Sequence, residues 1–246
     1  YHKMIILHAA QTDKIREYTL FCYPREMCGI LTEEDFHPLT NVAENPETSF
    51  SIDPKNLIPF LGKIKAVVHS HTKDPRKVSL FDLRTPSIED IKAQKLANVP
   101  FLIVGTEGQN VLPALEIPRE KTNNYIGRPF IWFIYDCYTL VQDYYLFELG
   151  ISLPDHKADK DYKELKDFDN VFAPYISEYG FIEKNDLEGL KNGDLFLLDN
   201  AGVQKNHLGI YHNGKVLHQD MISCEVPFEY FLGRIQKRLV YVGNSI

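Results

Sequence analysis

The sequence predicts an α+β protein built from two domains, and three observations lead to this prediction. At roughly 100–200 residues per domain, its 246 residues suggest one large domain or two small ones. Short apolar runs alternate with amphipathic stretches, which is typical of mixed helix and strand folds. A polar stretch over residues 116–127 interrupts the pattern. We therefore expect a mixed α/β domain over residues 1–115, a linker over 116–127 and an α+β domain over 128–246.

The first domain shows two amphipathic stretches and several apolar runs. A helix is expected over residues 13–23, because Pro24 follows it and ends it. A second helix is expected over residues 87–97, because Ser87 is followed by acidic residues, an N-terminal signature. Strands are expected over residues 5–7, 26–31, 65–71, 101–104 and 111–117.

The second domain begins with one long helix and continues as short strands. The helix is expected over residues 136–149, since Gly150 and Pro154 follow it. The pair Asn213-Gly214 predicts a hairpin with a two-residue type I′ turn. Strands are expected over residues 195–198, 208–211, 216–218 and 239–242.

Composition disfavours several classes of protein. Lys and Arg number 27 against 34 Asp and Glu, and a net charge of −7 argues against a dedicated nucleic-acid binder, which carries a basic face. No apolar run reaches the roughly 18 residues that suggest a membrane span. The four cysteines include no CxxC pair, so we expect free thiols in a reducing compartment.

Two histidines at the end of an expected strand indicate a metal site. Side chains alternate along a strand, so His69 and His71 lie on one face and can supply two zinc ligands. A catalytic zinc needs a third protein ligand, and a carboxylate base must act on its water. Asp90 is the preferred third ligand and Glu26 the preferred base. Asp82, which also lies three residues after a serine, is the alternative third ligand.

Cys137 at the start of the long helix is a candidate nucleophile. The positive end of a helix dipole lowers the pKa of a thiol, and the thiolate is the nucleophile. The hairpin turn places Gly209 opposite His218 and leaves His207 diagonally adjacent on the same face. His207 is then the candidate base and His218 its orienting partner. Gly209 is expected to leave open space between the two imidazoles.

Glu26, then His69-Ser70-His71, then Ser87-Ile88-Glu89-Asp90 occur in an order that resembles the JAMM (MPN) metallopeptidase motif. The resemblance implies a JAMM/MPN-like domain over residues 1–115 that cleaves amide or isopeptide bonds. It implies zinc bound by His69, His71 and Asp90, with Glu26 as general base and Ser87 as hydrogen-bond donor to the tetrahedral intermediate. Thr72 stands where the motif usually has proline.

The second half resembles the NlpC-type papain-like cysteine peptidases. The resemblance lies in Gly127-Arg128-Pro129-Phe130, Asp136-Cys137-Tyr138, Asn206-His207-Leu208-Gly209-Ile210-Tyr211 and Leu217-His218. It implies Cys137 as nucleophile, His207 as general base and His218 as orienting partner. Family members cleave amide bonds in peptidoglycan stem peptides. A glycine that usually precedes the Asp-Cys pair is missing, and Trp132-Phe133-Ile134 occupies that stretch.

A JAMM domain followed by an NlpC-type domain is the arrangement of the tail tip/tail assembly protein K family of long-tailed phages, which the chain resembles over nearly its whole length. The resemblance implies tail tip proteins and peptidoglycan as partners, and a place in the host cytoplasm during assembly or in the virion tail tip. We therefore expect a cysteine peptidase combined with a zinc peptidase. The alternative is a structural tail assembly protein with two inert domains. A deubiquitinase-like regulator would leave Cys137 unexplained.

The pH dependence separates two forms of the cysteine site. If His207 must be neutral to take the thiol proton, activity is greatest near neutral pH. A thiolate–imidazolium resting state would instead extend the acid limb to lower pH.

Overall fold

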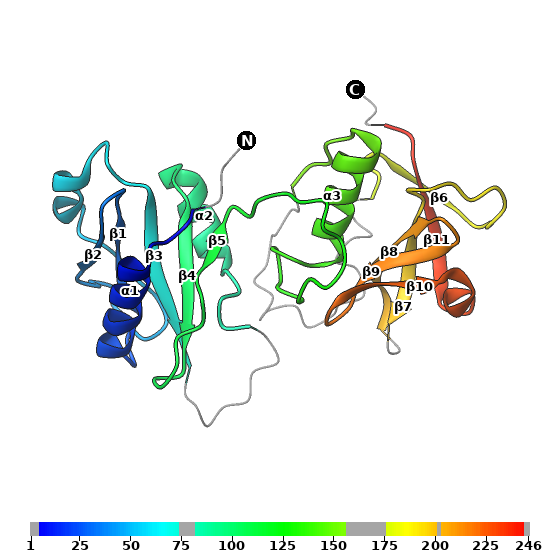
Figure 1. The fold of residues 1–246 in the computed structure, drawn as a ribbon. Helices are drawn as coiled ribbons and strands as arrows, with labels where there is room; N and C mark the ends of the chain where they lie inside the picture. The colour runs from blue at the N-terminus through cyan, green and yellow to red at the C-terminus, as the bar shows by residue number, and fades with distance from the viewer. Residues whose placement is uncertain (1–4, 74–81, 156–175, 201–202, 244–246) are drawn as a thin grey trace. The chain divides into compact units, whose positions relative to one another are not determined.

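The computed structural model describes residues 5–73, 82–155, 176–200 and 203–243. The chain divides into two compact units, Tyr1–Glu120 and Lys121–Ile246, and each combines helices with one sheet (Figure 1). The α+β class is therefore confirmed. The boundary falls within the expected linker, but strand β5 (Leu115–Ile117) extends the first sheet into its beginning.

The first unit is a five-stranded sheet in the order β2-β1-β3-β4-β5. Its strands β3 and β4 run parallel and the other neighbours run antiparallel. A parallel pair needs a crossover, which α2 provides, so the N-terminus of α2 returns to the carboxyl end of β3. The other elements are α1 (Ala9–Cys22), β1 (Cys28–Leu31), β2 (Phe36–Leu39), the 3-10 helix Pro54–Phe60, β3 (Ala66–Thr72), α2 (Ile88–Ala97) and β4 (Phe101–Thr106).

Two expectations for the beginning of the chain are wrong. Residues 5–7 form no strand, and the backbone N–H of Ile5 donates instead to the Glu116 carboxylate at 2.8 Å. Helix α1 begins at Ala9, four residues before the expected start, because the Gln11 side chain accepts from the His8 backbone N–H at 3.0 Å. Strand β2 was not expected; it contains Pro38, which an edge strand tolerates.

The second unit is a six-stranded antiparallel sheet in the order β10-β9-β8-β7-β11-β6. Helix α3 (Cys137–Leu149) packs against β8 and β9. Buried side chains of α3 meet Leu208 and Ile210 on that face. Phe196 and Phe231 belong to a smaller apolar cluster elsewhere in the unit. The strands are β6 (Phe181–Lys184), β7 (Leu195–Asn200), β8 (Val203–His212), β9 (Lys215–Gln219), β10 (Ser223–Pro227) and β11 (Ile235–Tyr241).

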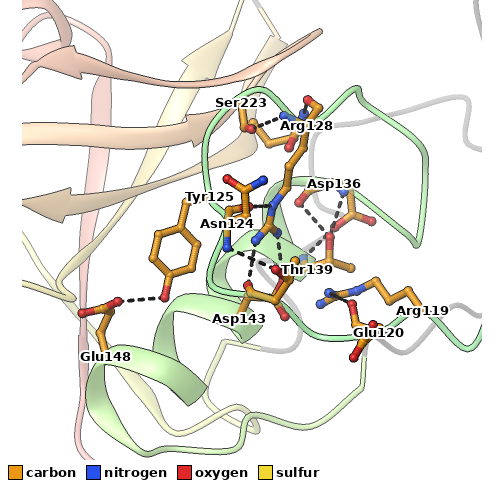
Figure 2. A network of polar contacts seen from close by, with 12 residues as sticks. Arg119, Glu120, Asn124, Tyr125, Arg128, Asp136, Thr139, Asp143, Glu148 and Ser223 are labelled. Carbon is orange, nitrogen blue, oxygen red and sulfur yellow. Dashed lines mark hydrogen bonds and ion pairs between the residues drawn. The ribbon is translucent and has the colours of Figure 1, made fainter. Parts of the chain in front are cut away.

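A buried polar network fixes the segment before α3 to the helix (Figure 2). Arg128 donates to Asp143 of α3 at 2.8 Å and to the backbone carbonyls of Asn124 and Thr122 at 2.5 and 2.8 Å. The Arg128 and Asp143 side chains are 5% and 0% exposed. Ser223 accepts from the Arg128 backbone N–H at 2.8 Å, which ties the segment to β10. The network therefore anchors the residues that lead into the start of α3.

Within the described ranges, no helix combines the length and apolarity that crossing a membrane requires.

Candidate functional site

The end of β3 and the first turn of α2 bring His69, His71 and Asp90 together. The two imidazole Nε2 atoms lie 3.3 Å from each other, and each lies 3.1 Å from one carboxylate oxygen of Asp90. One potential ligand atom of each residue lies within 4.8 Å of the others. His69 is fully buried and Asp90 nearly so. Two imidazole nitrogens and a carboxylate oxygen that converge in this way fit a divalent transition metal.

The start of α2 orients the Asp90 carboxylate. The Ser87 hydroxyl donates to Oδ2 of Asp90 at 2.7 Å and accepts from the Asp90 backbone N–H at 3.0 Å, which forms the N-terminal cap of the helix. The Ser87 backbone N–H also donates to Oδ2 at 2.7 Å. Nδ1 of His71 lies 2.8 Å from the Leu83 carbonyl oxygen, so Nε2 is the nitrogen that faces the cluster.

The three side chains of the cluster shift one another's pKa values. Burial lowers the pKa of His69. Burial also acts to lower the pKa of His71. The hydrogen bond and the charge of Asp90 outweigh burial, so the pKa of His71 is raised. Burial acts to raise the pKa of Asp90, yet His69 and His71 hold it well below the usual range. Asp90 is therefore a carboxylate beside a neutral His69 at pH 7, whereas His71 holds its proton more strongly than an ordinary histidine does. A metal ion bound here would displace that proton.

The two other carboxylates considered for this site lie in different places. In β1, Cys28 pairs with His69, and continuing that register places Glu26 opposite His71. The buried Glu26 carboxylate helps raise the pKa of His71, so it acts on the cluster. Asp82 instead forms an ion pair with Arg84, with oxygen and nitrogen 2.6 Å apart. The structure thus brings Asp90 to the histidines and leaves Asp82 outside the cluster.

Cys137 is the first residue of α3, and Asp136 is its N-cap. The Asp136 carboxylate accepts from the Thr139 backbone N–H at 2.8 Å. The buried thiol interacts with the N–H groups of Cys137, Tyr138 and Leu208, which favour the thiolate. Burial and then the Asp136 charge outweigh them and raise the pKa of Cys137. The helix start therefore acts on this pKa in the expected direction, but burial and the Asp136 charge determine the net shift, which is upward.

His207 on β8 and His218 on β9 form a hydrogen-bonded pair. The expected register is confirmed, because Gly209 lies opposite His218 and the turn residues Asn213 and Gly214 have φ angles of 50° and 79°. Nε2 of His207 lies 3.1 Å from Nδ1 of His218. Burial, followed by the influence of His218, lowers the pKa of His207 to about 4. The His207 imidazole is therefore neutral at pH 7.

The Cys137 thiol and the His207 imidazole are associated with successive residues of strand β8 but with opposite faces of the sheet. The thiol contacts the N–H of Leu208, the residue next to His207, and it packs with the Leu208 side chain on the α3 face. His207 lies opposite Leu198 in the β7 register, so its side chain occupies the other face. No hydrogen bond joins Cys137 to His207 among the described residues.

A cavity of about 230 Å³ adjoins the histidine pair. The open space expected at Gly209 is absent, because a Cβ there would lie 2.5 Å from Val216 Cγ1 and 3.0 Å from Leu198 Cδ1. That expectation is wrong, since neighbouring strands fill the position. The cavity is lined by Leu198, Asp199, His207, His218, Asp220, Cys224, Val226, Tyr230, Phe231 and Arg234.

Three features of this site escaped the sequence analysis. Phe133 occupies the stretch where glycine is usual and adopts φ of 65°, held by its N–H donating to Asp136 at 2.9 Å. The buried indole N–H of Trp132 has no hydrogen-bond partner within the described chain. Sγ of Cys224 lies 3.5 Å from Nε2 of His218. Extending the hairpin by one strand would have pointed to Cys224, whereas the other two features depend on tertiary packing.

Comparison with known proteins identifies the class of the second unit. Residues 127–241 match the NlpC/P60 family, so this unit is an NlpC/P60 domain. Over nearly its whole length, the chain is a homologue of the tail tip assembly protein K of Escherichia phage N15, with 29% identity over 243 residues and 93% of each chain covered. The solution structure of protein DSY2949 from Desulfitobacterium hafniense is 24% identical over 46% of this chain and 82% of that one, with a TM-score of 0.34.

These findings confirm the two resemblances that concern the second half and the whole chain. The JAMM/MPN identity of the first unit stays a prediction.

Proposed function

We propose that this chain is a tail assembly protein whose second unit is a cysteine peptidase acting on peptidoglycan stem peptides. The observation that carries the proposal is the NlpC/P60 match over a unit in which Cys137 starts α3 and contacts β8 at Leu208, one residue after His207 of the hydrogen-bonded histidine pair. Homology to a tail tip assembly protein supports phage tail proteins as partners. It also favours action in the host cytoplasm during assembly or in the virion tail tip.

In the proposed reaction, the Cys137 sulfur attacks the carbonyl carbon of the amide while Nδ1 of His207 takes the thiol proton. Nε2 of His207 is already engaged with His218, so Nδ1 is the nitrogen that remains. The carbon–nitrogen bond then breaks, and His207 gives its proton to the leaving amine. Water hydrolyses the resulting thioester. His218 orients the His207 imidazole and stabilises the charge that develops on it.

The experiment uses the purified full chain and muropeptides. Release of new amino termini is expected from the wild type, and Cys137→Ala should abolish it. Cys22→Ala is the matched control, because Cys22 is a half-buried thiol at the end of α1 in the first unit. Equal release by wild type and Cys137→Ala would refute the peptidase assignment.

A structural role without turnover is the second candidate. It is favoured by the missing hydrogen bond between Cys137 and His207 among the described residues. Assembly of infectious particles with Cys137→Ala or His69→Ala distinguishes the two functions. Normal particle numbers and infectivity from both variants would favour the structural role.

We further infer that the first unit is a JAMM/MPN-like zinc peptidase. The convergent donors of His69, His71 and Asp90 support this inference. Zinc held by these three residues would act as a Lewis acid on a peptide or isopeptide carbonyl. Glu26 would take a proton at its carboxylate. Ser87 would orient Asp90 and turn its hydroxyl to the tetrahedral intermediate. Stoichiometric zinc in the purified protein tests the inference.

A further inference from the structure

Strand β10 adds a thiol to the histidine pair. Cys224 lies directly opposite His218 in the antiparallel register of β10 and β9. Its Sγ is 3.5 Å from Nε2 of His218, whose Nδ1 is 3.1 Å from Nε2 of His207. Three side chains from three neighbouring strands therefore form one continuous series of hydrogen bonds. Cys224 ends the series and lines the cavity beside it.

We propose that Cys224 is a positioning residue for the proposed cysteine peptidase: its sulfur accepts the Nε2 proton of His218 and so holds both imidazoles in the tautomers that leave Nδ1 of His207 available to Cys137. The inference rests on the proposed peptidase function and adds a fourth residue to its site.

The ring nitrogen that carries each hydrogen determines the direction of each hydrogen bond. To take the proton of Cys137, neutral His207 must have a bare Nδ1 and carry its hydrogen on Nε2. That hydrogen is donated to Nδ1 of His218, so the hydrogen of His218 must lie on Nε2. The atom facing Nε2 must then be an acceptor, and the sulfur of Cys224 is that atom. The same directions hold after His207 has gained the proton, so the series needs no rearrangement during the reaction.

Cys224 is the hydrogen-bond partner that faces Nε2 of His218. Among the described residues, the His218 side chain hydrogen-bonds with His207 and Cys224, and its ring packs edge-on against Phe231 with centroids 5.1 Å apart. Burial raises the pKa of Cys224, which keeps the thiol neutral at pH 7. The charged groups that face the pair are Asp199 from β7, Asp220 after β9 and Arg234 before β11.

The test compares Cys224→Ala with Cys224→Ser in the full chain. Alanine removes the acceptor, whereas the serine hydroxyl keeps one. Two rates are measured across pH: muropeptide cleavage, and alkylation of Cys137 by iodoacetamide followed by mass spectrometry of its peptide. Asp199, Asp220 and Arg234 are unchanged in both variants, so a difference in pH profile belongs to Cys224. Cys22→Ala again controls for the loss of a thiol.

For Cys224→Ala we expect kcat/KM to fall about fivefold with KM unchanged, the size of effect that one neutral hydrogen bond supports. The acid limb of Cys137 alkylation should move to lower pH, because protonated His207 loses part of its stabilisation. Cys224→Ser should recover most of both effects. Wild-type values in Cys224→Ala would overturn the inference, as would equal loss in both variants with a lower melting temperature.

The two proposals fail in different ways. A wild type that cleaves no muropeptide contradicts the peptidase function, yet alkylation needs no substrate and still tests Cys224. A wild type that cleaves muropeptides, accompanied by an unaffected Cys224→Ala, contradicts only the role of Cys224.

Discussion

Nε2 of His207 lies 3.1 Å from Nδ1 of His218, and both rings are buried. The consequence is that Nδ1 is the nitrogen of His207 left for the base role in the proposed peptidase. Burial raises the pKa of Cys137 and lowers the pKa of His207 to about 4. The resting site therefore holds a neutral thiol and a neutral imidazole, so in the proposed peptidase proton transfer would accompany the attack on substrate.

The first prediction concerns the acid limb of activity. Because His207 stays neutral until the pH falls toward about 4, kcat/KM should remain near its plateau below the ordinary histidine pKa of 6.5. A pH–rate profile on muropeptides measures this. A thiolate–imidazolium pair would give a similar acid limb, so thiolate absorbance in the ultraviolet is the control, and none is expected at neutral pH. An acid limb centred at 6.5 would contradict the prediction.

The second prediction concerns stability. In the unfolded chain His207 is protonated near pH 6.5, whereas in the folded chain its protonation requires a pH of about 4. Between these values the unfolded state binds more protons, so the free energy of unfolding should fall as the pH falls, by about 1.4 kcal/mol per unit at most for this group. Thermal unfolding of wild type and His207→Gln measures the effect. The variant should lose stability less steeply; identical slopes would show that His207 is not the group responsible.

The third prediction concerns the close approach of strands at Gly209. Gly209→Ala should destabilise the second unit by about 1–3 kcal/mol, because its Cβ would lie 2.5 Å from Val216 Cγ1. It should also reduce peptidase activity, since His218 follows two residues after Val216 on β9. Urea unfolding and muropeptide cleavage are the measurements. Adding Val216→Ala should restore part of the loss, and a double variant no better than the sum of the single ones would argue against this contact.

The hairpin and the helix start were predictable because they depend on local chemistry. Asn213-Gly214 specifies its turn, and a two-residue turn determines every cross-strand pair up to His218. The Asp136 cap likewise places Cys137 in the first turn of α3. The thiol pKa was not predictable, because it depends on how deeply other strands bury the sulfur.

The carboxylate of the candidate metal cluster shows where the sequence leaves a choice. Asp82 and Asp90 both follow a serine by three residues, so spacing alone does not separate them. The structure separates them, because the N-terminal cap of α2 holds the Asp90 carboxylate toward His71. Asp82 instead forms an ion pair with Arg84. Strand β2, with its proline, was missed because an edge strand needs little of the usual strand pattern.

The fourth prediction concerns zinc. We expect about one zinc ion per chain by elemental analysis, and loss of most of it in Asp90→Asn, because an amide is a weaker ligand than a carboxylate. Added zinc should raise the melting temperature of the wild type, since it binds the folded state. Asp82→Asn is the matched control, because its carboxylate pairs with Arg84 outside the cluster. Equal zinc loss in both variants, or none in Asp90→Asn, would contradict the assigned ligand.

The fifth prediction concerns the buried ion pair between Arg128 and Asp143. Arg128→Met should destabilise the second unit by about 3–5 kcal/mol, because it removes the Arg128 cation from the fully buried Asp143 carboxylate. The variant should also slow muropeptide cleavage, since Arg128 anchors the segment that leads to Cys137. Urea unfolding followed by tyrosine fluorescence, together with a cleavage assay, measures both effects.

A double variant separates charge from anchoring. Arg128→Met combined with Asp143→Leu removes the uncompensated charge, so stability should recover in part. Activity should recover less, because the donors to the Asn124 and Thr122 carbonyls are still missing. If the double variant is as unstable as Arg128→Met, the buried charge is not the main cost and the carbonyl contacts carry the stability. If activity recovers fully with stability, the network contributes to the fold alone and has no part in holding Cys137 in place.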